Sequence, residues 1–324
     1  MKRGWPLLLL LVGCCRVGAA AGLDGARCVA PAKPGGGFDL TCQLTRDLLQ
    51  RAGQTRQPLG IVYQPGGIGA LAFKATVAQR PPDGRTVTAF SSGSLLNLAQ
   101  GRFGPYQPQD VRWLAVLGMD HGVVAVRRDA PYKTLAQLLD ALRTQPGTVV
   151  FGAGGSIGSQ DWMKTALLAR AAGLSHKAMR FVAFEGGGEA LTALTGDHVQ
   201  VVAGDAAEVG RHLEQGAAIR VLAVLSRERL TGRWANVPTA REQGIDLQWP
   251  IVRGLYMGPG VSERELRDWT DALGKAMERP LAAREWNAVG MERAWITGPE
   301  LDRLVQAQVA QYKALAAEFG LVRP

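Results

Sequence analysis

Short glycine-rich loops, each placed between an expected strand and an expected helix, constrain the fold of this chain more than any other feature. Residues 27–30 are expected to form a strand, residues 34–37 are Pro-Gly-Gly-Gly, and a helix is expected from Asp39. Leucines at every fourth position across residues 40–48 give that helix one buried stripe. Asp39 is expected at its N-cap, where a carboxylate can accept hydrogen bonds from free backbone N–H groups.

The same order of strand, loop and helix recurs along the chain. Further strands are expected at residues 60–64, 86–90, 149–151, 180–184 and 199–203, each followed by a loop that contains glycine. Strands that alternate with helices of this length indicate βαβ units and parallel-rich sheets. The expected fold class is therefore α/β, and 324 residues with 47% hydrophobic composition are enough for two domains.

Two expected crossings of the chain predict a two-lobed molecule with a cleft between the lobes. Residues 114–117 and 123–126 are expected to be neighbouring strands at the first crossing, and residues 251–257 are expected to return as a strand. The predicted domain 1 comprises residues 22–126 and 251–324, and the predicted domain 2 comprises residues 127–250. Two crossings form a hinge, so the lobes can close around a ligand.

The first 21 residues have the features of an export signal. Residues 2–3 are basic, residues 7–12 are apolar, and residues 18–21 are small enough for a signal peptidase. The apolar run is too short to span a bilayer, which needs about 20 residues. Cleavage near Ala21 predicts a periplasmic protein, while the Leu-Val-Gly-Cys sequence ending at Cys14 leaves open a lipid anchor at that cysteine.

Cysteine, histidine and overall charge limit the possible partners. Cys28 and Cys42 flank the first glycine loop, and both a disulfide and two buried free thiols remain open. The four histidines show no metal-ligand spacing, so neither a metal nor a cofactor is expected. The net charge of +9 comes from scattered basic residues without interleaved aromatics, which argues against nucleic acid as a partner.

The loops themselves are candidates for binding an anion. In open α/β sheets ligands bind beyond the carboxyl ends of the strands, where these loops lie and where helix N-termini present free N–H groups. Residues 152–159 contain more Gly and Ser than a turn requires, and residues 34–39 are a second candidate. Residues 91–94 suit a plain turn equally well. No loop ends in the Gly-Lys-Ser/Thr of a phosphate-binding P-loop, and none contains arginine, so helix dipoles are expected to neutralise the ligand.

A serine esterase is the principal alternative. Residues 154–158 match the G-x-S-x-G nucleophile motif, with Ser156 as nucleophile, and Asp205 and His212 follow in the chain order of a catalytic triad. However, Asp205 and His212 are seven residues apart at one expected helix, which makes the triad geometry difficult. The prediction is therefore that the chain is not an enzyme.

Several blocks of the sequence resemble the substrate-binding proteins of tripartite tricarboxylate transporters, the Bug-type periplasmic receptors. The first block is Pro-Ala-Lys-Pro-Gly-Gly-Gly-Phe-Asp-Leu-Thr-Cys at residues 31–42. Its sequence is most similar to that of the citrate-type branch of the family. Similar blocks occur at residues 151–162, 184–199, 216–229, 237–244 and 253–260. The resemblance implies a two-lobed periplasmic binding protein, a monomer that closes on a di- or tricarboxylate and delivers it to integral membrane permease subunits.

The resemblance also implies which residues contact the ligand. They come from the first-lobe loop, from the start of a second-lobe helix and from neighbouring positions of the cleft: Gly36, Gly37, Phe38, Asp39, Gly155, Ser156, Ile157, Gly158, Ser159, Ser91, Ser92 and Asp205. A receptor that signals by docking to a sensor protein shares this fold and site, so that hypothesis remains open beside transport.

Overall fold

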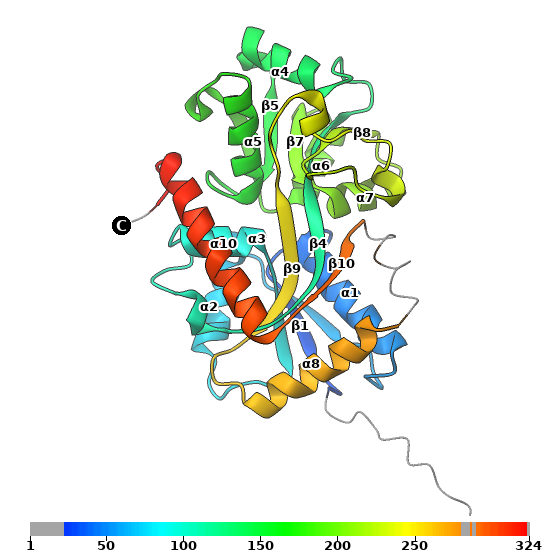
Figure 1. Ribbon diagram of the computed structural model, residues 1–324, viewed down its shortest axis with the longest axis vertical. Helices are drawn as coiled ribbons and strands as arrows, with labels where there is room; N and C mark the ends of the chain where they lie inside the picture. The colour runs from blue at the N-terminus through cyan, green and yellow to red at the C-terminus, as the bar shows by residue number, and fades with distance from the viewer. Residues whose placement is uncertain (1–22, 280–285, 287–289, 323–324) are drawn as a thin grey trace, which may run out of the picture.

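The computed structural model describes residues 23–279, residue 286 and residues 290–322. Two α/β lobes lie one above the other in Figure 1, and the long strands β4 (Arg112–Arg127) and β9 (Pro250–Met257) run between them. The predicted export signal and Cys14 lie outside the described residues. None of the described helices is both long and apolar enough to cross a lipid bilayer.

The first lobe is built on a mixed sheet. Parallel strands β2, β1 and β3 lie side by side, β9 is antiparallel to β3, and β4 is antiparallel to β9 and β10. The strand bounds are β1 Arg27–Ala30, β2 Gly60–Tyr63, β3 Thr86–Ser91 and β10 Glu292–Ile296. The helices of this lobe are α1 Gly37–Arg51, α2 Ala70–Ala78, α3 Ser92–Ala99, α8 Glu263–Met277 and α10 Gly298–Glu318.

The second lobe repeats the α/β pattern on a smaller scale. Strands β6, β5 and β7 are parallel, and β4 pairs antiparallel with β7 and β8. The strand bounds are β5 Val150–Gly154, β6 Arg180–Phe184, β7 Val201–Asp205 and β8 Ile219–Val224. The helices are α4 Leu135–Thr144, α5 Gln160–Ala171, α6 Gly187–Thr195 and α7 Ala206–Glu214.

Strand β4 belongs to both lobes, and here the sequence prediction of two neighbouring strands is wrong. The strand is continuous over 16 residues. Asp120 lies between the two predicted strands; it is fully buried and ion-paired, and the strand continues through it. The partner of β4 changes from β9 to β7 between His121 and Gly122. The domain boundaries given above remain a prediction.

Helix starts follow the sequence signals at two positions and depart from them at a third. Thr134 with Gln137 and Ser262 with Glu265 both match the capping-box pattern in the sequence. Thr134 caps α4 by accepting the N–H of Gln137, and Ser262 forms a full capping box with Glu265 at α8. The prediction of Asp39 as N-cap is wrong, because α1 begins at Gly37. Asp39 instead lies buried within the first turn of α1, where its Oδ2 accepts a hydrogen bond from the N–H of Gly35 in the preceding loop.

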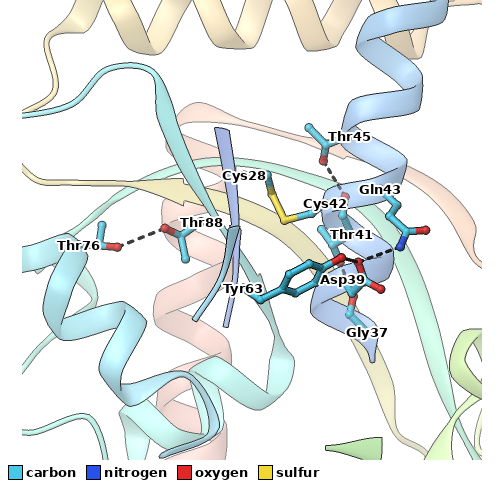
Figure 2. Close-up of a disulfide and its surroundings, with 10 residues drawn as sticks. All are labelled: Cys28, Gly37, Asp39, Thr41, Cys42, Gln43, Thr45, Tyr63, Thr76 and Thr88. Carbon is cyan, nitrogen blue, oxygen red and sulfur yellow. Dashed lines mark hydrogen bonds between the residues drawn. A yellow bond between two sulfur atoms is a disulfide. The ribbon is translucent and has the colours of Figure 1, made fainter. Parts of the chain in front are cut away.

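A disulfide joins Cys28 of β1 to Cys42 of α1, which decides between the two alternatives for this pair (Figure 2). Both cysteines are fully buried in the hydrophobic core of the first lobe. The bridge therefore fixes the first turns of α1 against the sheet, directly beside the glycine loop that precedes this helix.

Candidate functional site

A cavity of about 60 Å³ lies where the two lobes meet. Its walls come from the loops that follow β1, β3, β5 and β6, and from β7, α7 and β9. The lining residues are Pro31, Ala32, Gly36, Gly37, Phe38, Ile68, Ser91, Gly93, Asn97, Gly154, Ser159, Gln160, Asp161, Glu185, Gly186, Gly187, Asp205, Glu208 and Arg253.

The N-termini of α1, α3, α5, α6 and α7 meet at this cavity. Ser91 caps α3 by accepting the N–H of Gly93, and Ser159 caps α5 by accepting the N–H of Trp162. In α1 and α6 the N-cap is a glycine, Gly36 and Gly186, so no N-cap side chain caps either helix; in α1 the N–H of Gly37 already donates to Glu208 Oε1, whereas no such bond occurs at the start of α6 among the described residues. Backbone N–H groups of an uncapped helix N-terminus suit a carboxylate.

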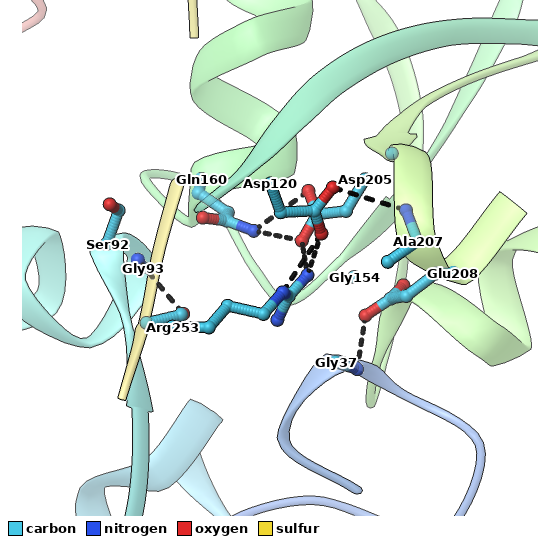
Figure 3. A network of polar contacts seen from close by, with 12 residues as sticks. Gly37, Ser92, Gly93, Asp120, Gly154, Gln160, Asp205, Ala207, Glu208 and Arg253 are labelled. Atoms are coloured by element: carbon cyan, nitrogen blue, oxygen red, sulfur yellow. Dashed lines mark hydrogen bonds and ion pairs between the residues drawn. The ribbon is translucent and has the colours of Figure 1, made fainter. Parts of the chain in front are cut away.

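Arg253 of β9 is the central cation beneath the cavity (Figure 3). Its Nε and Nη2 donate to Asp120 Oδ2 at 2.9 and 2.6 Å, and Nη2 also donates to Asp205 Oδ2 at 2.8 Å. These three side chains are buried. Arg253 and Asp120 come from strands that join the lobes, and Asp205 comes from the second lobe, so the network lies at the hinge.

Lys164 of α5 is a second buried cation. Its Nζ lies 2.6 Å from Asp205 Oδ1 and 3.0 Å from Asp161 Oδ1, and it donates to the carbonyl of Gly204 at 2.7 Å. The other oxygen of Asp161 accepts the N–H of Gly154 at 2.9 Å. Burial opposes the charge of Lys164, but the two carboxylates outweigh it and raise the pKa of this amine, so it stays protonated.

Burial is the largest influence on the carboxyl groups of this network. It raises the pKa of Asp120. It opposes ionisation of Asp205 as well, but Lys164 and Arg253 outweigh burial there and lower the pKa of Asp205. Burial together with the charge of Asp205 raises the pKa of Glu208 to about 8. The charge of Glu208 therefore changes in the range around pH 8.

Glu208 of α7 reaches across the lobe interface. Its Oε1 accepts the N–H of Gly37 at the start of α1, at 2.5 Å (Figure 3). Its Oε2 lies over Gly187 at the start of α6, where an added Cβ would be 1.9 Å away. A Cβ on Gly37 would similarly lie 2.0 Å from Arg253 Nη1. These two glycines are needed because the buried ionic side chains occupy the space of a side chain.

Other contacts hold the lobes together around the cavity. Gln100 Nε2 donates to the carbonyl of Gly158 at 2.8 Å, and Arg102 donates to Ser156 Oγ at 3.2 Å. At the rim, Lys33 Nζ pairs with Glu189 Oε1 at 2.8 Å. These contacts join loops of different lobes, so the structure represents a closed arrangement of the two lobes.

The residues proposed from the sequence as ligand contacts divide into two groups. Gly36, Gly37, Phe38, Ser91, Ser159 and Asp205 line the cavity. Asp39, Ser92, Gly155, Ser156, Ile157 and Gly158 lie outside its lining. Ser156 and Ile157 are exposed on the loop that contacts Arg102, and Ser92 Oγ accepts the N–H of Val252. The role of each residue toward a ligand stays a prediction.

Sequence reasoning missed the charged residues of the cavity. Arg253 lies on a strand, and Lys164 and Glu208 lie on helices, whereas the ligand contacts predicted from the sequence lie mainly in loops and at helix starts. Arg253 lines the cavity although none of the glycine loops contains an arginine, and neutralisation of the ligand by helix dipoles stays a prediction. An available signal was a single arginine inside the otherwise apolar strand at residues 250–257, since a buried charge requires a partner.

The geometry does not assemble an esterase triad. The carboxylate of Asp205 is occupied by Lys164, Arg253 and Gln160, and Ser156 Oγ accepts from Arg102. No cluster of three or more potential metal ligands occurs among residues 23–279, 286 and 290–322. The cavity is thus equipped for non-covalent binding through backbone donors and buried charges.

Comparisons with known proteins agree with this architecture. A family model described as "Tripartite tricarboxylate transporter family receptor" matches residues 44–321. A curated relative, the "UPF0065 protein in gbd 5'region" of Cupriavidus necator, is 26% identical over 271 residues, which cover 82% of this chain and 79% of the relative.

Two solved structures share the fold. The periplasmic binding protein BugD superimposes with a TM-score of 0.82 at 16% identity, over 92% of this chain and 98% of BugD. MatC of Rhodopseudomonas palustris, determined with bound malate, superimposes with a TM-score of 0.78 at 22% identity, over 90% of this chain and 99% of MatC. Both superpositions include the two lobes and the strands that join them, since they extend over nearly the whole chain.

Proposed function

Since the chain belongs to the tripartite tricarboxylate transporter family of receptors, which are periplasmic solute-binding proteins and not enzymes, we propose that it captures a small carboxylate between its lobes. The observation that carries the proposal is the uncapped N-terminus of α6 at the interlobe cavity, beside the N-termini of α1, α3, α5 and α7. Backbone N–H groups there can replace the hydration shell of a carboxylate.

Capture proceeds by closure of the lobes. The ligand enters when the lobes are apart, and the closed arrangement is favoured because it contacts the ligand from both sides. Direct contacts between the lobes, such as the hydrogen bond from Gln100 to the carbonyl of Gly158, stabilise the closed arrangement independently of the ligand. The closed receptor then delivers its ligand to the integral membrane permease subunits of a tripartite transporter, acting as a monomer.

The size of the carboxylate is part of the proposal. The sequence suggests a di- or tricarboxylate such as citrate, and malate is the ligand in the MatC structure. A cavity of about 60 Å³ surrounded by buried carboxyl groups supports a ligand with one or two carboxylates better than citrate. Each additional negative charge would lie close to the carboxylate of Asp205, which raises its energy.

Thermal unfolding of the purified protein against malate, succinate, adipate, citrate and aspartate tests the proposal. A ligand at about 100 times its Kd adds roughly 2.7 kcal/mol, a shift of a few degrees. Gly186→Leu should remove the shift, because position 186 lines the cavity with open space around it. Gly147→Leu is the matched control, since that glycine also has open space but lies away from the cavity. Absence of a shift with every carboxylate would contradict the proposal.

A further inference from the structure

The charged groups at the cavity are not balanced. Four buried carboxyl groups surround two buried cations, Lys164 and Arg253. Asp120 and Asp205 share the guanidinium, and Asp161 and Asp205 share the ammonium group. Both cations therefore have their partners before a ligand enters, and neither is left to neutralise a ligand carboxylate.

Glu208 is the fourth carboxyl, and it makes no ion pair with any of the residues that the structure describes. Glu208 Oε1 accepts a hydrogen bond from the N–H of Gly37. Glu208 Oε2 faces Gly187 at the cavity. The side chain is 7% exposed, so water compensates little for a missing cation. Glu208 also takes the N–H of α1 that a ligand carboxylate would otherwise use.

Two further acceptors at the cavity have no donor within the described part of the chain. Asn97 Oδ1 and Gln160 Oε1 are both buried and both belong to lining residues. The orientation of each amide is fixed by its NH₂ group, which donates to Ile68 O for Asn97 and to Asp205 for Gln160. Buried acceptors of this kind normally have a partner, so the cavity favours a ligand that carries hydrogen-bond donors.

We propose that the ligand is a carboxylate that also carries a protonated amine, and that Glu208 selects it by holding the ammonium group. The proposal rests on the carboxylate-binding function above and narrows its substrate class. The ligand carboxylate lies at the uncapped N-terminus of α6, while the ammonium group supplies the positive charge and the donors that the acidic side of the cavity requires. Glu208 is thus the specificity-determining residue.

The pH dependence of binding has opposite signs for the two ligand classes. Glu208 faces Asp205 of β7, Asp161 of α5 and Arg253 of β9. Burial and the charge of Asp205 hold its pKa at about 8, so it is largely protonated near neutral pH. An ammonium group favours the ionised form and releases the proton, so its affinity rises with pH. A ligand that is purely anionic favours protonated Glu208, so its affinity falls as pH rises.

Titration calorimetry with matched ligands tests the proposal. The pairs are aspartate with succinate, glutamate with glutarate, and γ-aminobutyrate with butyrate, each measured from about pH 6 to about pH 8. The amine-bearing member of at least one pair should bind about tenfold or more tightly than its partner, with affinity that increases with pH.

Glu208→Gln keeps an oxygen for the N–H of Gly37 and removes the charge. This variant should lose most of the preference for the amine and its pH dependence. Glu228→Gln, a neutral change on the exposed surface, should behave as the unmodified protein. Thermal unfolding verifies that both variants fold.

The outcomes separate the two proposals. Tighter binding of the plain carboxylate, or a preference for the amine that survives in Glu208→Gln, overturns the role of Glu208 and leaves carboxylate capture standing. Failure of all six compounds to bind overturns the inference about the amine, and carboxylate capture itself is contradicted only if malate, adipate and citrate also fail to bind.

Discussion

The guanidinium Nη1 of Arg211 on α7 lies 3.2 Å from Asp39 Oδ2 on α1, so an ion pair joins the two lobes beside the cavity. Asp39 is buried and also accepts hydrogen bonds from Tyr63 and Gln43, each at 2.8 Å, which fix its carboxylate on the first lobe (Figure 2). Arg211 Nη2 donates to Gln43 Oε1 at 2.8 Å. The pair is therefore a contact of the closed arrangement.

Arg211→Gln should weaken ligand binding, because the closed state loses a charged interlobe contact and the open state does not. A partly exposed pair of this kind contributes about 1 kcal/mol, which corresponds to roughly fivefold in Kd. Titration calorimetry measures the change. Arg229→Gln is the control, since its pair with Glu242 lies within the second lobe and is exposed. Equal Kd values for the two variants would show that the Arg211 pair does not bias closure.

Gly37→Ala should destabilise the protein, whereas the neighbouring change Gly36→Ala should be nearly neutral. A Cβ at position 37 would lie 2.0 Å from Arg253 Nη1, while one at position 36 meets Glu208 Oε1 at 3.7 Å, an ordinary contact. Overpacking of a buried site costs about 1–3 kcal/mol. Urea unfolding monitored by tryptophan fluorescence measures the difference. Equal stability of both variants would mean that Arg253 can move away from α1 at little cost.

Removal of the disulfide by Cys28→Ala and Cys42→Ala together should lower the free energy of unfolding by about 3 kcal/mol, plus a small cost of lost packing. The bridge spans a sequence separation of 14 residues and ties β1 to α1. Thermal unfolding with and without a reductant measures the effect. The reductant should lower the Tm of the unmodified protein and leave that of the double variant unchanged. If the reductant also lowered the Tm of the double variant, the decrease in Tm could not be attributed to the Cys28–Cys42 disulfide.

The α/β fold was predictable because its signals are local. Strand, glycine loop and helix follow each other within short segments, and the capping residues Thr134 and Ser262 mark helix starts correctly. The error at β4 lies at Asp120, between the two predicted strands. Asp120 pairs with Arg253, 133 residues away in the sequence, and also accepts the N–H of Ala207, so its contacts within the strand are long-range.

The site was predictable in part for the same reason. Gly36, Gly37 and Ser159 lie at helix starts that the sequence pattern indicates, and they line the cavity. Glu208 and Lys164 do not follow a loop pattern, and each finds its partner across the fold. The chemistry of the cavity thus depends on long-range pairing of charges, which single-sequence patterns do not contain.

Glu208 should make the stability of the ligand-free protein depend on pH. Burial and the charge of Asp205 raise the pKa of Glu208 to about 8 in the folded state, from an ordinary value of 4.5. Between these values the unfolded chain loses this proton while the folded protein retains it, so the free energy of unfolding should fall as pH rises through that window. The contribution is complete below about pH 4.5 and is lost above about pH 8.

Urea unfolding of Glu208→Gln and of Glu228→Gln at several pH values isolates this contribution. The difference in unfolding free energy between the unmodified protein and Glu208→Gln should change steadily across the window, because glutamine does not titrate. Glu228 is exposed, so its replacement should leave the pH dependence as it is. Parallel curves for all three proteins would place the pKa of Glu208 near its ordinary value. Glu208 would then be ionised at neutral pH in the closed cavity, and the affinity of an amine-bearing ligand would not vary with pH in that range.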